Sequence, residues 1–354
     1  MSKEKLTVLN RISSPSQKFN KIALSIALLT AGSEVFAQQY ILDGPTASGS
    51  ITGAYTYEGT VNNPAAIAVM NGGKLTTSSS ITALPYDLNG YSILVTGANS
   101  RIDVINRGLR ANLGEAPGST GLFVSEGTFN NLNSWFVAHT ASSNEMTGKV
   151  TGIHAISGAT VTVEGAQINL FPTRDYANST LTGTNAILIE HGNSNVQDTT
   201  VTTSGQLLIQ LQGNEGHGVY VLNDSAIATD AKDGVMRIYG LENAIDIIGN
   251  SSYALATGKT TYGTSRIFVG DEQTSAKGTI AITTQGINAH GIVTAPKGEI
   301  KLYGDGQTIK TVGAGASDLV SNGGVIDITG DGHQLTTMDA HAVVASGGGG
   351  VLSI

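Results

Sequence analysis

Hydrophobic and polar positions near the end of the sequence alternate with a period of two, and the alternating stretches recur at a longer interval. A glycine precedes each stretch, at Gly298, Gly324 and Gly350, which are 26 residues apart. An alanine recurs ahead of each glycine at intervals of 27 and 24 residues, at Ala289, Ala316 and Ala340. Repetition at such a period is typical of a solenoid, in which each repeat forms one turn.

The alternation predicts which side of each strand is buried, because successive side chains of a strand point to opposite faces. The apolar face of the three repeats consists of Ile300, Leu302, Ile326, Ile328, Leu352 and Ile354. The polar face consists of Glu299, Lys301, Asp327 and Ser353. We therefore expect one dry face and one wet face in every repeat.

Weaker copies of two patterns extend upstream. A triplet of His or Asn, then Ala or Gly, then Ile or Val begins at His154, Asn185, His217, Asn243, His290 and His341. Alternating strands recur at Gln206–Leu211, Val235–Tyr239 and Arg266–Val269. The unequal gaps between copies predict connections of varying length around a constant frame.

These features predict an all-β chain that folds as a right-handed parallel β-helix of the pectin-lyase-like type. Each coil of about 25 residues would hold two or three strands and stack on the next at about 4.8 Å. One coil cannot bury enough apolar surface to offset its ordering entropy, so several must stack. An antiparallel β-sandwich is the competing fold, but its loops are not expected to repeat one turn glycine at a 26-residue spacing.

The first 37 residues have the pattern of a secretory signal peptide. Five basic residues, Lys3, Lys5, Arg11, Lys18 and Lys21, precede an uncharged, mostly apolar run of 11 residues at 22–32. This run is too short to span a bilayer. Signal peptidase is expected to cleave between Ala37 and Gln38. The competing interpretation is a buried helix of the folded domain.

The rest of the chain divides into two parts. Residues 38–60 are polar and contain tyrosines, which predicts an N-terminal cap, and residues 61–354 carry the β-helix repeats. Leu352 and Ile354 lie in mid-strand, and natural proteins cover an apolar coil end. We therefore expect the repeats to be truncated at this point, with further solenoid or another domain beyond it.

Charge and composition exclude some partners. The net charge is −8, and removal of the leader leaves 14 basic and 25 acidic residues, a net charge of −11. Such a chain has no electrostatic basis for binding nucleic acid. It contains no Cys, which agrees weakly with export across two membranes.

Several motifs in the sequence are candidates for catalytic or metal-binding sites. Gly216-His217-Gly218 matches a motif of β-helical polygalacturonases, but the neighbouring acidic pair is missing and Arg237-Ile238-Tyr239 stands where those enzymes have Arg-Ile-Lys. We interpret His217 as a turn-edge residue.

Gly304-Asp305-Gly306 and Gly330-Asp331-Gly332 are interpreted as turns, with a calcium site as the alternative. His139, His191 and His333 lack metal-site spacing. The sequence thus predicts no catalytic, cofactor or metal residues.

The leader Met1–Ala37, the absence of Cys and the Gly/Ser/Thr/Asn-rich coils from about Ala66 to Ile354 together resemble the passenger region of adhesin-like autotransporters (type V secretion). The resemblance implies a β-helix exported through the periplasm to the cell surface by a C-terminal outer-membrane barrel. This sequence lacks the aromatic-rich alternating strands of such a barrel, so the translocator is expected outside this chain.

The resemblance also implies a structural or adhesive role in adhesion, aggregation, biofilm formation or virulence, without enzymatic activity. The expected partner is a glycan or protein on a host or neighbouring cell, and self-association is possible on this view. Two alternatives stay open. One is a β-helix polysaccharide lyase or hydrolase, which needs carboxylates that converge on one face; the other is an inert stalk that presents a further domain.

Overall fold

The computed structural model describes residues 36–52, 55–60, 65–85, 90–105, 108–114, 118–140, 149–171, 183–191, 197–223, 232–258, 263–271, 278–346 and 349–354. Every element in these ranges is a β-strand, and every strand pairing among them is parallel. The prediction of a parallel β-helix is confirmed, and the antiparallel sandwich is excluded. No described segment forms a helix long and apolar enough to cross a bilayer.

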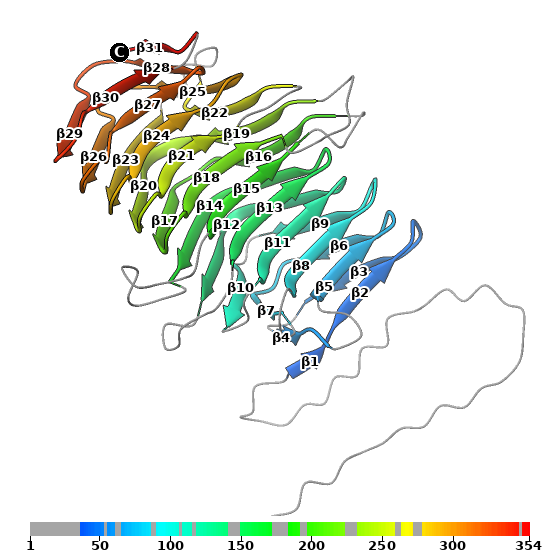
Figure 1. The fold of residues 1–354 in the computed structure, drawn as a ribbon. Coiled ribbons are helices and arrows are strands. Elements are labelled where there is room, and N and C mark those ends of the chain that lie inside the picture. Colours follow the sequence, from blue (N-terminus) through cyan, green and yellow to red (C-terminus); the bar gives the residue numbers. More distant parts are fainter. Residues whose placement is uncertain are drawn as a thin grey trace, which may run out of the picture.

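Three rows of strands run along the solenoid, and the chain visits them in turn before it rises to the next coil (Figure 1). The first row is an 11-stranded sheet. Its strands are β2 (Tyr40–Asp43), β5 (Ala65–Met70), β8 (Tyr91–Thr96), β11 (Thr120–Ser125), β13 (Thr151–Ile156), β15 (Asn185–Glu190), β18 (His217–Leu222), β21 (Tyr253–Thr257), β24 (His290–Thr294), β27 (Leu319–Asn322) and β30 (Val343–Ser346).

The second and third rows belong to one 20-stranded sheet. The second row contains β3 (Ser48–Ile51), β6 (Lys74–Thr77), β9 (Arg101–Ile105), β16 (Thr199–Thr203), β19 (Gly234–Ile238), β22 (Ser265–Val269), β25 (Gly298–Tyr303), β28 (Val325–Thr329) and β31 (Val351–Ser353). The third row contains β1 (Phe36–Gln38), β4 (Tyr55–Glu58), β7 (Ile81–Leu84), β10 (Leu109–Gly114), β17 (Leu207–Gln212), β20 (Gly240–Ile248), β23 (Gly278–Gln285), β26 (Thr308–Val312) and β29 (Gln334–Met338).

Two long strands join these two rows. The first half of β12 (Thr128–Thr140) pairs with β9 and its second half with β10. The first half of β14 (Thr160–Leu170) pairs with β16 and its second half with β17. In these two coils, one continuous strand therefore passes through the corner between the second and third rows. In the other coils, one strand ends before this corner and a separate strand begins after it.

The core is a set of aliphatic columns along the solenoid axis. In the first row, in-register pairing stacks Ile67, Ile93, Leu122, Ile153, Ile187, Val219, Leu255, Ile292 and Leu319, all of them buried. Parallel strands lie about 4.8 Å apart, so each side chain contacts the equivalent one above and below. This arrangement explains why the interior uses small aliphatics.

The 26-residue repeat at the end of the chain is confirmed by the register. Glu299 pairs with Val325, which pairs with Val351, so the three preceding glycines are equivalent positions. Ile300 and Ile326 are buried in the interior, and Leu352 packs against the same core. Lys301 pairs with Asp327 on the outer face. The predicted dry and wet faces are therefore correct for the first two repeats, whereas in the third Leu352 is only partly buried and Ile354 is exposed.

Two upstream assignments were wrong. His154 lies three positions beyond the triplet register, because Thr151 is the residue that pairs with Asn185. Asn243 belongs to the third row, in β20, and not to the first. Gln206–Leu211 likewise overlaps third-row β17, whereas Val235–Tyr239 and Arg266–Val269 overlap second-row strands. The error has a simple cause: all three rows alternate in the same way, so a short match does not identify its row.

The small central residue of the triplet has a steric reason. A Cβ at Gly218 would lie 2.6 Å from the carbonyl oxygen of Ala254 and 2.8 Å from Cγ2 of Ile245 in the third row. The position therefore faces inward at a corner where the rows approach each other closely. Only Gly or another very small residue fits there.

The predicted cap, residues 38–60, forms the first complete coil of the described stack, since β2 pairs with β5, β3 with β6 and β4 with β7. Tyr40, Tyr55 and Tyr57 pack at this end against the aliphatic core. The Tyr40 and Tyr57 rings meet edge to face at 5.9 Å, and burial raises the pKa of Tyr57 to about 12. Aromatic rings thus occupy positions where later coils carry aliphatic residues.

We expect Ile300→Ala to lower the free energy of unfolding by roughly 2 to 5 kcal/mol, because Ile300 is fully buried and its loss leaves a cavity in the column. The exposed Thr283→Ala is the control and should change it little. Urea unfolding followed by circular dichroism measures both. Equal effects would contradict the assignment of the inner face.

A second prediction concerns Asp318, a fully buried carboxyl that accepts a 2.8 Å hydrogen bond from Thr337 Oγ1. Burial raises the pKa of Asp318, against the effect of hydrogen bonds from Thr337 and Thr311. Because the folded pKa lies above the unfolded one, the stability gained from the protonated form is present at low pH and lost as pH rises through the folded pKa. Asp318→Asn should therefore raise the melting temperature at pH 7 and change it much less at pH 3.

The matched control for Asp318 is Asp327→Asn, which removes a carboxylate from the outer face of the next strand. It should show no such pH-dependent gain. The quantity to compare is the melting temperature of Asp318→Asn minus that of the wild type. If this difference were smaller at pH 7 than at pH 3, it would contradict a raised pKa of Asp318.

Candidate binding surface on the second row

The outer face of the second row brings together charged and aromatic side chains from three consecutive coils. Register pairs Arg237 with Phe268 and Phe268 with Lys301 in one column. In the adjacent column, Arg266 pairs with Glu299. All five side chains are partly exposed. Residues more than thirty positions apart in sequence are therefore direct neighbours on the surface.

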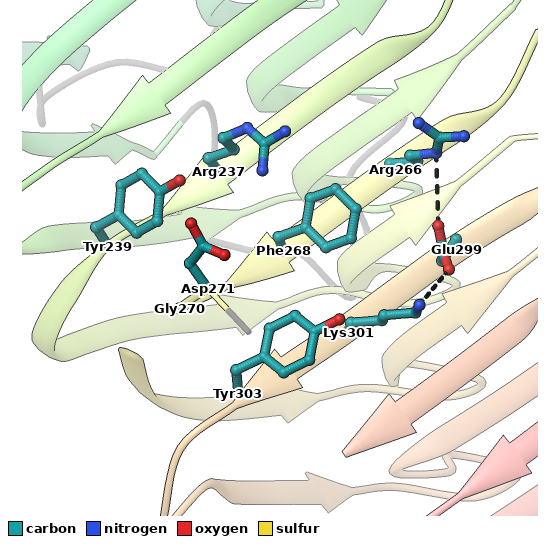
Figure 2. A pocket seen from close by; sticks show the side chains of 9 residues that line it. All are labelled: Arg237, Tyr239, Arg266, Phe268, Gly270, Asp271, Glu299, Lys301 and Tyr303. Atoms are coloured by element: carbon teal, nitrogen blue, oxygen red, sulfur yellow. Dashed lines mark ion pairs between the residues drawn. The ribbon is translucent and has the colours of Figure 1, made fainter. Parts of the chain in front are cut away.

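Two tyrosines and a glycine lie at the ends of these three strands. Val269 pairs with Ile238 and Leu302, and the residues that follow these three are Gly270, Tyr239 and Tyr303. Gly270 has a positive φ of 76° and contributes no side chain between the two tyrosines. Figure 2 shows the two tyrosine rings on either side of Gly270 and Asp271.

Side chains of these three coils surround a shallow depression of about 370 Å³. It is lined by Arg237, Tyr239, Arg266, Phe268, Gly270, Asp271, Glu299, Lys301 and Tyr303. Its volume falls at the lower end of the range of small-ligand sites, but its lining is more polar than is usual for them, with three aromatic rings among five charged side chains. The lining carries three cationic and two anionic side chains, on a chain whose net charge is −8.

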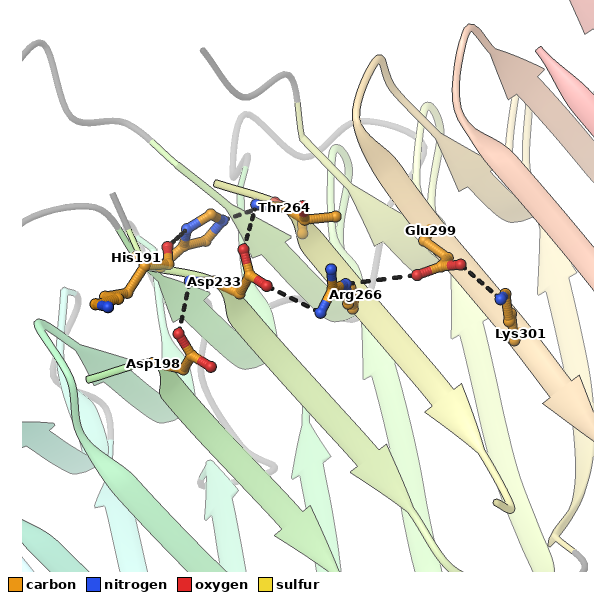
Figure 3. A network of polar contacts seen from close by, with 9 residues as sticks. His191, Asp198, Asp233, Thr264, Arg266, Glu299 and Lys301 are labelled. Atoms are coloured by element: carbon orange, nitrogen blue, oxygen red, sulfur yellow. Dashed lines mark hydrogen bonds and ion pairs between the residues drawn. The ribbon is translucent and has the colours of Figure 1, made fainter. Parts of the chain in front are cut away.

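Ion pairs fix one side of the depression (Figure 3). Arg266 lies between two carboxylates, with Nη1 2.9 Å from Asp233 Oδ2 and Nε 3.5 Å from Glu299 Oε2. The Nε contact is an ion pair without hydrogen-bond geometry. Glu299 Oε1 also lies 2.7 Å from Lys301 Nζ. The chain of charges spans three strands and holds these side chains in one arrangement.

Backbone amides anchor the carboxylate at the start of this chain of charges. The Thr264 N–H donates to Asp233 Oδ1 at 2.7 Å, and the Asp233 N–H donates to Asp198 Oδ1 at 3.0 Å. Nearby, His191 Nδ1 lies 2.7 Å from the Lys232 carbonyl and its Nε2 lies 2.9 Å from Ser265 Oγ. Burial lowers the pKa of His191, so its ring is neutral and structural at pH 7.

Arg237 is held differently. Its guanidinium carbon lies 5.1 Å from the centre of the Phe268 ring, a cation–π contact. In the described ranges, no carboxylate lies within ion-pair distance of its guanidinium, although Arg266 and Lys301 both have one. The depression therefore contains one cation whose charge is available to a ligand.

The structure places the other residues considered in the sequence apart from this depression. His217 stacks on Tyr220 with ring centres 4.3 Å apart, and its Nδ1 lies 3.0 Å from Asn185 Oδ1. Burial lowers the pKa of His217 to about 4, so the ring is neutral at pH 7. These contacts support its interpretation as a residue of the first-row edge.

The two Gly-Asp-Gly turns stack on each other. The Asp331 N–H donates to Asp305 Oδ1 at 3.0 Å, and the Gly306 N–H donates to the Asp331 carbonyl at 2.8 Å. His333 Nδ1 accepts from the Gln307 N–H at 3.3 Å, and burial lowers the pKa of His139. No group of three potential metal ligands was found among the described residues.

Residues 1–35 of the predicted leader lie outside the described residues. The expected cleavage pair, Ala37 and Gln38, falls in β1, where Ala37 pairs with Tyr57 and Gln38 with Glu58. The cleavage itself stays a prediction.

The depression was missed in the sequence, although part of the signal was present. The strands at Val235 and Arg266 had been recognised as copies of one pattern. Extending their alignment to Glu299 and one residue beyond each strand would have placed Tyr239, Gly270 and Tyr303 side by side. In the sequence, Arg237 and Tyr239 stood out only as part of an alternating strand and as a mismatch to an enzyme motif.

Comparison with known proteins gave no match to any family model, to any curated protein or to any solved structure.

We expect Glu299→Gln to lower the pKa of Lys301 toward its usual value, because the hydrogen bond from Lys301 to Glu299 is the main cause that raises it. NMR titration of the Lys301 side chain measures the change. Glu58→Gln is the control: Glu58 is an exposed residue of third-row β4, and its substitution should leave the pKa of Lys301 unchanged. An unchanged Lys301 pKa in Glu299→Gln would contradict the ion pair.

Proposed function

We propose that this chain is an exported bacterial surface protein that acts in adhesion, aggregation or biofilm formation and binds surface glycans through the depression on its second row. Export by the autotransporter route belongs to the same proposal and is supported by the resemblance of the leader and the coils. The β-solenoid fold is consistent with such a role, since it displays a long side face on a stiff frame.

The observation that carries the proposal is the depression lined by Tyr239, Phe268 and Tyr303 together with charged side chains. The C–H bonds on the face of a sugar ring pack well against aromatic rings, and its hydroxyl groups need polar partners close by. The lining of the depression contains both kinds of group. Glu299 and Asp233 are also engaged in ion pairs with Arg266, an arrangement that favours holding a ligand over proton transfer.

The test is binding of the purified protein to a glycan array and to bacterial and host cells. Gly270→Asn should reduce binding at least tenfold, because Gly270 lines the depression and Asn, which tolerates a positive φ, adds a side chain to that lining. Gly306→Asn is a matched control: its φ is 72°, and nothing lies within 4 Å of a Cβ placed there.

A second variant distinguishes loss of the binding site from misfolding caused by the substitution at Gly270. Tyr239→Ala combined with Tyr303→Ala removes both rings without adding a side chain and should also abolish binding, while circular dichroism stays that of the wild type. If the wild type binds no glycan and no cell, the chain is better explained as an inert stalk. Cleavage of a polysaccharide by the purified protein would favour the enzyme alternative.

A further inference from the structure

The outer face of the first row carries an apolar strip along the solenoid (Figure 1). In-register pairing stacks one outward residue of each strand into a column, which consists of Ile41, Ala68, Leu94, Phe123, His154, Leu188, Tyr220, Ala256, Val293, Val320 and Val344. Only His154 and Tyr220 bring polar atoms into this column. All described strands belong to the three rows, so no described strand covers this face.

Part of the strip is a hydrophobic cluster that is separate from the core. Its members are Ala256, Val293 and Val320, with Tyr220, Tyr253 and Val344 packed against them. Aromatic contacts extend the strip toward the first coils, since the Phe123 ring lies 5.1 Å from the rings of Tyr91 and His154. Contiguous apolar surface of this kind marks a site of contact with another molecule.

The strip is nearly free of charge. In the first-row strands from β5 to β30, Glu190 is the only Asp, Glu, Lys or Arg, and it pairs with His154 at 3.1 Å. The outer faces of the other rows carry charged residues, such as Arg266 on the second and Asp246 on the third. Two copies of a chain with a net charge of −8 can therefore approach through the first row without bringing like charges together.

The dimensions of the strip agree with those of a protein–protein interface. From β8 to β30 it extends over ten strands at a spacing of about 4.8 Å, or roughly 43 Å in all. Its width along the six-residue strands is about 16 Å. The flat area is on the order of 700 Å², close to the roughly 800 Å² that each partner buries in an interface of standard size.

The sizes of the side chains in the column favour a second copy in the opposite direction. The residues are large from Leu94 to Tyr220 and smaller from Ala256 to Val344. If two copies face each other with antiparallel axes and a two-fold axis at Tyr220, the large half of each column opposes the small half of the other. Both copies repeat at about 4.8 Å, so the contacts stay in step along the strip.

We propose that two copies of this chain associate face to face through the first-row strip, with antiparallel solenoid axes and a two-fold axis near Tyr220. A two-fold dimer buries the same patch on both subunits. Leu94 of one copy then lies opposite Val344 of the other, and Leu188 lies opposite Ala256. This inference goes beyond the proposed function, because it concerns a different face from the depression and does not depend on glycan binding.

Analytical ultracentrifugation of the purified protein over a range of concentrations tests the surface. The wild type should dimerise reversibly. Leu188→Glu should raise the dissociation constant at least tenfold, because it buries a carboxylate against the apolar face of the other copy. Leu188→Lys should do the same, which separates the burial of a charge from the change in net charge. Leu188 lies outside the core, so circular dichroism should stay that of the wild type.

The matched control is Thr283→Glu, which adds the same carboxylate to an exposed position on the outer face of the third row. It should dimerise like the wild type. A wild type that stays monomeric at every concentration would overturn the proposal, as would a dimer that Leu188→Glu does not weaken. Glycan binding through the depression would stand in either case, and a dimer that binds no glycan or cell would refute the proposed function alone.

Cysteine cross-linking tests the orientation, because the chain has no Cys of its own. Leu94→Cys and Val344→Cys should form a disulfide-linked dimer only when the two variants are mixed. In the antiparallel dimer, the two copies of either position lie eight strands apart, roughly 38 Å. Cross-linked dimers of each variant by itself would overturn the antiparallel arrangement.

Discussion

Parallel, in-register stacking of one coil on the next is the interaction on which the rest of this structure depends. Each coil buries few apolar side chains, and its backbone groups find partners only in the neighbouring coils. The columns of aliphatic residues inside and the ladders of hydrogen bonds along the three rows therefore stabilise the chain together. The packing environment of a side chain is therefore set less by its neighbours in sequence than by the equivalent residues in the coils above and below it.

The same stacking constrains the outer face. Equivalent positions of adjacent coils lie about 4.8 Å apart, so like charges in one column repel each other. The three coils that line the depression avoid this by alternation: Arg266 is followed by Glu299, and Phe268 separates Arg237 from Lys301. Ion pairs across strands are a consequence of this spacing.

The sequence predicted the class of fold well and the site poorly, for one physical reason. Alternation and the spacing of Gly298, Gly324 and Gly350 report directly on strands and turns, and the structure confirms both. Register across coils depends on connections of unequal length, which short matches do not resolve. His154 and Asn243 were misassigned for that reason. The depression needs correct register in three coils at once, so no local pattern indicates it.

A site built from three coils inherits the rigidity of the stack, and this has a consequence for recognition. Phe268 and Tyr303 lie in β22 and β25, whose backbones are held by ladder hydrogen bonds on both sides, and Tyr239 directly follows β19. The ion pairs of Arg266 hold the adjoining side chains in place. Little reorganisation is then needed when a ligand binds, so even a shallow surface can be selective. Selectivity in such a solenoid changes through single substitutions in a column, without any change to the fold.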